Sequence, residues 1–183
     1  MGLEIKVSCW KPVVGMLLMG ASLLSASAPA APNMNFRGVL VAEACTLRPG
    51  DEDIPLQLWD TSSKYLYLNT RTIGKPFEIH LEGCDVSIGN NVTITFSGNA
   101  STVLSGLLAL GGGSTAAGVA IGIETPAGNL LPLNVTSDRQ TLTSGANVIA
   151  LKAFIKAEPQ AIANQSIAAG FLTATSTFTL SYP

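Results

Sequence analysis

The end of the chain alternates strictly between apolar and polar side chains, and this pattern allows little besides a β-strand. The apolar or small positions are Leu172, Ala174, Ser176, Phe178, Leu180 and Tyr182, and threonines or a serine stand between them. A period of two places alternate side chains on opposite faces of an extended backbone. The run therefore predicts a strand with one face in the core and the other in water.

Shorter runs with the same period, bounded by Gly, Asn and Pro, occur along the rest of the chain. They cover residues 34–40, 54–58, 77–82, 92–96 and 119–123. Residues 148–155 form a longer apolar run, which is typical of a strand buried on both faces. No segment has a convincing helical period, although residues 102–110 could form a short helix or turn. Several short strands with this punctuation predict an all-β fold, an antiparallel sandwich of the immunoglobulin-like type.

The N-terminal region has the features of a secretory signal peptide. Lys6 and Lys11 precede an apolar run, residues 13–24, which is followed by small residues up to Ala30. Twelve apolar residues are too few to span a hydrocarbon core of about 30 Å. We therefore expect residues 1–30 to be removed on export, and no later segment to span a membrane directly.

Two cysteines, Cys45 and Cys84, remain after this cleavage. In an oxidising compartment they are expected to form a disulfide, whose loop of about forty residues stabilises the fold by about 3–4 kcal/mol. A redox pair would need a C-x-x-C spacing, which they do not have.

The composition argues against several classes of function. The formal net charge is −2 and no block of basic residues occurs, so nucleic-acid binding is not expected. His80 is the single histidine, no G-x-S-x-G motif is present, and the acidic residues show no paired-carboxylate motif. We therefore expect no catalytic residues, no metal site and no cofactor, and hence no enzyme.

Several segments in order resemble the pilin subunits of the chaperone–usher pathway, close to the minor and adaptor subunits of P-type and type 1 pili. The resemblance covers most of residues 33–183. It runs through residues 35–40, Cys45, residues 76–84, 92–98 and 118–123, and ends at residues 169–183. The ending is the most specific part, because the family carries a glycine fourteen residues from the end and a penultimate tyrosine, where Gly170 and Tyr182 stand.

The resemblance implies an incomplete immunoglobulin-like sandwich, residues 45–183, which lacks its final strand and is completed by donor-strand complementation. A periplasmic chaperone would lend a strand first, and the N-terminal arm of a neighbouring pilin subunit would replace it at an outer-membrane usher. The arm of this chain would be residues 31–44. Its groove-facing positions would be Met34, Phe36, Gly38 and Leu40, with Asn35 and Arg37 facing outward.

The same resemblance assigns the C-terminal strand to the edge of the groove. The residues expected to border it or to contact the chaperone are Gly170, Leu172, Phe178, Leu180, Tyr182 and Pro183. The terminal carboxylate of Pro183 would be held by basic residues of the chaperone. The chain would be secreted through the periplasm and would end in a fimbrium on the cell surface.

Two other functions remain open from the sequence. A self-complete secreted sandwich that binds a carbohydrate or a protein would need no chaperone, and a secreted hydrolase would depend on His80. Within the pilus hypothesis, a two-domain tip adhesin is disfavoured because the mature chain has room for one domain. A minor or adaptor subunit in cell adhesion is preferred over a major rod subunit or a terminator.

Overall fold

The computed structural model describes residues 43–183, so the expected signal peptide and the arm positions Met34, Phe36, Gly38 and Leu40 lie outside the described residues. Seven strands and two short helices are assigned within the described range. In chain order they are β1 (Thr46–Leu47), α1 (Ser63–Asn69), β2 (Lys75–Cys84), β3 (Asn91–Gly98), β4 (Val119–Glu124), β5 (Gln140–Thr141), β6 (Gly145–Ala157), α2 (Pro159–Ala163) and β7 (Ser176–Ser181).

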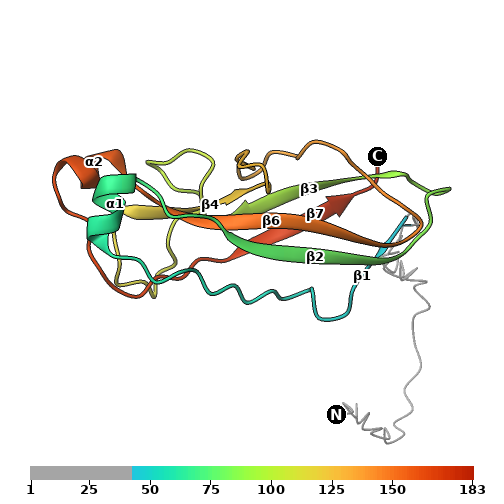
Figure 1. Ribbon diagram of the computed structural model, residues 1–183, viewed down its shortest axis with the longest axis horizontal. Coiled ribbons are helices and arrows are strands. Elements are labelled where there is room, and N and C mark those ends of the chain that lie inside the picture. The colour runs from blue at the N-terminus through green and yellow to red at the C-terminus, as the bar shows by residue number, and fades with distance from the viewer. Residues whose placement is uncertain (1–42) are drawn as a thin grey trace, which may run out of the picture. The chain divides into compact units, whose positions relative to one another are not determined.

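These strands form two antiparallel sheets that pack face to face, as the alternating pattern predicted (Figure 1). One sheet has the order β1-β2-β6-β4 and the other β5-β3-β7. Every pairing between named strands is antiparallel. β7 pairs with β3 on one side only, so it is an edge strand of the smaller sheet.

The core lies between the inward faces of the two sheets. Ile79 and Leu81 of β2 and Val92 of β3 are the largest fully buried side chains. β4 is buried at all six positions, because both of its faces are covered. On one of them Phe154 lies against Gly122, where an added Cβ would come within 2.8 Å of the ring.

The expected disulfide between Cys45 and Cys84 is present. It links the residue just before β1 to the last residue of β2, and the N–H of Asp85 donates to the carbonyl of Ala44 at 2.7 Å beside it. The start of the described chain is therefore fastened to the turn between β2 and β3.

Residues 54–58 differ from their expected secondary structure. They belong to no strand, yet Ile54, Leu56 and Leu58 are partly buried while the residues between them are exposed. The period of two is kept because the segment lies extended on the core, but no neighbouring strand completes a ladder with it.

Helices α1 and α2 are not predicted from the sequence because both are too short for a period to be visible. Ser62 caps α1 by accepting a hydrogen bond from the N–H of Tyr65 at 3.2 Å, and α2 begins at Pro159. An N-cap serine and a proline in the first turn both favour the start of a helix, but they predict one only when an amphipathic pattern follows. Residues 102–110 form turns rather than a helix.

Candidate functional site

A long open groove lies between two extended segments, residues 52–61 and 170–178, and we take it as the candidate site. Two connected hollows form it, with volumes of about 690 and 550 Å³. Both hollows are lined by Leu56, Leu58, Ile121 and Ala174, so they are parts of one groove.

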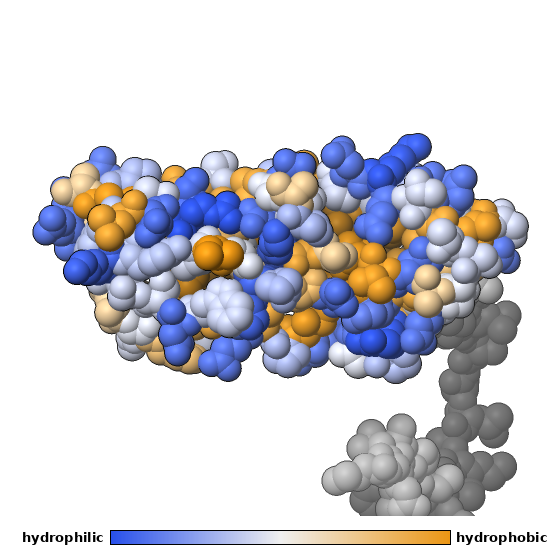
Figure 2. All heavy atoms as spheres, viewed as in Figure 1, coloured by the Kyte–Doolittle hydropathy of each residue, from blue (hydrophilic) through white to orange (hydrophobic). Residues whose placement is uncertain are grey.

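The floor of the groove is the hydrophobic core itself. Side chains from both sheets reach it: Phe77, Phe96, Leu108, Ile121, Ile123, Ala153 and Ile155. In a closed sandwich such residues would be covered by another strand, and the exposed apolar surface of an open one favours binding of an apolar partner. Figure 2 shows apolar residues emerging among polar ones on the face that carries β2 and β6.

The first wall is β7 together with the extended residues that precede it. Its inward-facing side chains are only partly buried, and they are Leu172, Ala174, Ser176, Phe178, Leu180 and Tyr182. The alternation predicted from the sequence is thus confirmed. The side chains stay half-exposed because the core continues past this wall without a covering strand.

Residues 170–175 were expected to be part of the last strand. Instead they are extended but outside any strand, and the loop at residues 111–116 holds them by backbone hydrogen bonds. The N–H of Gly111 donates to the carbonyl of Thr173 at 2.7 Å, and the N–H of Thr115 donates to the carbonyl of Phe171 at 2.8 Å. Gly170 permits this approach, since an added Cβ would lie 2.8 Å from the backbone nitrogen of Ala116. The loop therefore fixes the wall from outside and leaves its other side facing the groove.

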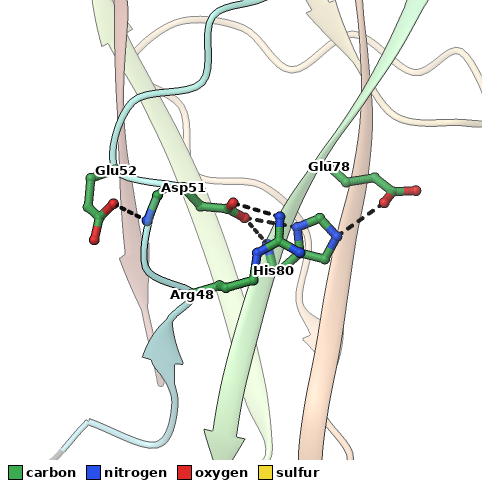
Figure 3. Close-up of polar contacts among 6 residues, drawn as sticks. Arg48, Asp51, Glu52, Glu78 and His80 are labelled. Carbon is green, nitrogen blue, oxygen red and sulfur yellow. Dashed lines mark hydrogen bonds and ion pairs between the residues drawn. The ribbon is translucent and has the colours of Figure 1, made fainter.

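The second wall is formed by residues 52–61. It begins next to a cluster of hydrogen bonds centred on Asp51, which we call the clasp (Figure 3). One Asp51 oxygen accepts the backbone N–H of His80 at 2.7 Å and lies 2.9 Å from His80 Nδ1. The other oxygen accepts from Arg48 at 2.9 Å. These hydrogen bonds lower the pKa of Asp51 to about 2, and the bond from the backbone N–H of His80 has the largest effect. The charged carboxylate ties residues 48–51 to β2 immediately before the wall starts.

His80 belongs to this clasp, and both of its ring nitrogens face carboxylates. Its Nδ1 faces Asp51, and its Nε2 lies 3.3 Å from a carboxylate oxygen of Glu78. No serine, threonine or cysteine is among its hydrogen-bond partners in residues 43–183. The same part of the chain contains neither a cluster of metal-binding side chains nor a helix long and apolar enough to cross a membrane.

The predicted edge residues fall in different places along the groove. Gly170, Leu172 and Phe178 line it directly. Leu180 packs on the core beyond it, as does Tyr182, whose hydroxyl lies 3.5 Å from the carbonyl oxygen of Cys45. Burial, and then the charge of Glu43, raise the pKa of Tyr182. Pro183 is exposed at the end of the chain.

Sequence reasoning missed the second wall as part of the site. Ile54, Leu56 and Leu58 line the groove together with Trp59. Their alternation is visible in the sequence, but by itself it predicts an ordinary strand. An interrupted strand signal that follows a Pro-Gly turn and contains Pro55 could have identified an unpaired edge.

Comparison with known proteins gives consistent relatives. The fimbrial protein family matches residues 34–183. The putative minor fimbrial subunit PmfF of Proteus mirabilis is 32% identical over 91% of this chain and 93% of its own length. The fimbrial adapter PapK of Escherichia coli is 30% identical over 92% of this chain and 97% of its own length.

Solved structures support the architecture. The P pilus rod subunit PapA superimposes with a TM-score of 0.66 at 21% identity, over 77% of this chain and 100% of that one. At this identity the likeness establishes the fold alone, an immunoglobulin-like pilin sandwich.

Proposed function

The chain belongs to the fimbrial protein family, and we propose that it is a subunit of a chaperone–usher pilus on the cell surface, which assembles by donor-strand exchange through its open groove. The observation that carries the proposal is the uncovered core between residues 52–61 and 170–178. Its role is structural rather than catalytic, in keeping with the relatives named above.

A β-strand is the partner that fits this groove. β7 has an unpaired edge, and the side chains along the floor and walls are apolar. A strand added at this edge gains backbone hydrogen bonds, while alternate side chains fill the hollows. A globular ligand or a sugar would leave the row of backbone groups without partners.

The occupant we propose in the fibre is the N-terminal arm of a neighbouring subunit. In this chain the arm carries Met34, Phe36 and Leu40 with Gly38 between them, and burying each large apolar side chain contributes about 1.5–3 kcal/mol. We propose that the arm runs antiparallel to β7, as do all pairings between the named strands. Its C-terminal end then lies near Gly170.

Before assembly, the same groove needs a temporary cover. We propose that a periplasmic chaperone supplies a strand there and contacts the exposed carboxylate of Pro183, and that exchange takes place at an outer-membrane usher. The similarity to the adapter PapK and to the putative minor subunit PmfF favours a minor or adaptor position in the pilus.

The proposal is tested by thermal unfolding of the oxidised mature chain that lacks residues 31–43. The unfolding midpoint is measured with and without a peptide of those residues. The midpoint is expected to rise substantially with the peptide, because the peptide binds only the folded state. A Phe36→Asp peptide serves as the control and should raise it little, since a charge would enter an apolar hollow.

A self-complete binding module predicts a different result. Its midpoint would already be high without peptide, and neither peptide would change it. That outcome would reject donor-strand exchange for this chain and would return the secreted carbohydrate- or protein-binding module as the preferred function.

A further inference from the structure

A third, smaller hollow opens beside the groove at the end that carries α1. Its volume is about 470 Å³. We call it the α1 hollow, and its lining residues are Trp59, Asp60, Thr61, Ser62, Tyr65, Thr72 and Ile73. It shares Trp59, Asp60 and Thr61 with the groove, so the two surfaces are continuous.

The α1 hollow exposes more apolar than polar surface, although four of its seven lining residues are polar. Ile73 is 76% exposed and Trp59 52% exposed, and Leu68 on the adjacent helix is also 76% exposed. One cation lies beside it, because the ammonium of Lys75 is 3.5 Å from the centre of the Trp59 ring. The neighbouring helix α1 carries a second, Lys64. Such a surface suits an apolar partner that carries negative charge, although Asp60 also lies within it.

The opposite end of the strands presents a turn that is both apolar and negatively charged. Residues 85–89 form most of the connection between β2 and β3, and Val86 and Ile88 in it are 39% and 52% exposed. Asp85 orders the turn by accepting from the backbone N–H and the hydroxyl of Ser87 at 2.9 and 2.6 Å. The bonds from Ser87 lower the pKa of Asp85, so the turn stays negatively charged.

The length of the arm brings these two ends together. Three residue steps separate Leu40 from Glu43, which is at most about 11 Å of chain. With Leu40 in the part of the groove near Gly170, the folded body of the donor must begin close to the α1 hollow of the acceptor. The turn lies at that point of the donor, since Asp85 is hydrogen-bonded to Ala44.

We propose that residues 85–89 of one copy pack into the α1 hollow of the copy whose groove holds its arm. The inference rests on the donor-strand function and commits to a second copy of this chain as the neighbour, so it concerns the places where copies of this subunit follow one another. Val86 and Ile88 would cover Trp59 and Ile73, and the acidic turn would face Lys64 and Lys75. The contact is head-to-tail, so it repeats along a fibre without closing a ring.

The first test is self-assembly of the mature chain, residues 31–183, followed by sedimentation. Ile73→Glu should weaken assembly at least about tenfold, because it loses the burial of one large apolar side chain. Val135→Glu is the matched control, since Val135 is 53% exposed on a segment beside β3 and should assemble like the wild type.

A free arm peptide separates the two proposals. It carries no folded body, so it should raise the unfolding midpoint of the wild type and of Ile73→Glu equally. Equal assembly of the wild type and Ile73→Glu, or a wild type that stays monomeric, would overturn the contact proposed here. A peptide without effect on the wild type would instead reject donor-strand exchange.

A cross-link tests the contact directly. The Ile73→Cys, Ile88→Cys chain should give a ladder of disulfide-linked species on oxidation, because the two thiols meet between neighbouring copies. The Val135→Cys, Ile88→Cys chain should give none. A ladder of equal extent in both, or in neither while the chains still assemble, would contradict the proposal.

Discussion

At the scale of single residues, Gly170 shows why one position in a wall of the groove must be glycine. Its φ does not lie in the left-handed region, so backbone freedom is not the reason. The reason is contact, because a Cβ there would press on the backbone of Thr115 and Ala116. The residue links a family signature to the position of the groove wall.

Gly170→Ala is therefore expected to destabilise the fold by about 1–3 kcal/mol, the usual cost of overpacking, and to lower the affinity for the arm peptide. Chemical unfolding and peptide titration measure the two effects. Gly112→Ala is the control, since a Cβ added at Gly112 would meet no other atom within 4 Å. Equal stability of both variants would contradict the steric explanation.

Asp51 makes a prediction about pH. In the folded protein its pKa is about 2, below the ordinary value of 3.8. The charged carboxylate therefore contributes fully to stability above about pH 5, and this contribution is lost as the pH falls from about 5 to about 2. Asp51→Asn should be less stable than the wild type at about pH 7, and the difference should shrink between about pH 5 and pH 2. Urea unfolding at each pH checks it, and a constant difference would show that the charge plays no part.

At the scale of elements, the sequence predicted those strands whose position follows from their own pattern of apolar side chains. The runs at 77–82, 92–96, 119–123 and 148–155 lie in β2, β3, β4 and β6, because a half-buried or buried strand leaves a visible pattern of side chains. The same pattern at residues 54–58 predicted burial but not pairing. Whether an extended segment has a neighbour depends on the rest of the fold, so the second wall could not be found from it alone.

The site shows the same division between local and distant information. The alternation through Phe178 and Tyr182 predicted which face of the last strand points inward, and the structure confirms it. The Asp51–His80 clasp joins residues 29 positions apart, and no pattern in either segment indicates the other. The arm positions Met34, Phe36, Gly38 and Leu40 remain predictions, because they lie outside the described residues.

At the scale of the whole molecule, an incomplete sandwich has less burial to stabilise it than a closed one, so the Cys45–Cys84 disulfide should matter most before a donor strand binds. Removing a native disulfide from a small secreted domain costs about 2–5 kcal/mol and often abolishes folding at about 37 °C. The Cys45→Ala, Cys84→Ala chain without residues 31–43 is therefore expected to be largely unfolded at that temperature.

Binding of the arm should compensate for the missing disulfide, because a ligand that binds only the folded state raises its stability by an amount that grows with ligand concentration. Adding the arm peptide to the double variant should restore cooperative unfolding and the native circular dichroism spectrum. The Phe36→Asp peptide should not. If the double variant stays unfolded at saturating peptide, the disulfide is needed to form the groove itself, since it fastens the chain just before the second wall to the end of β2.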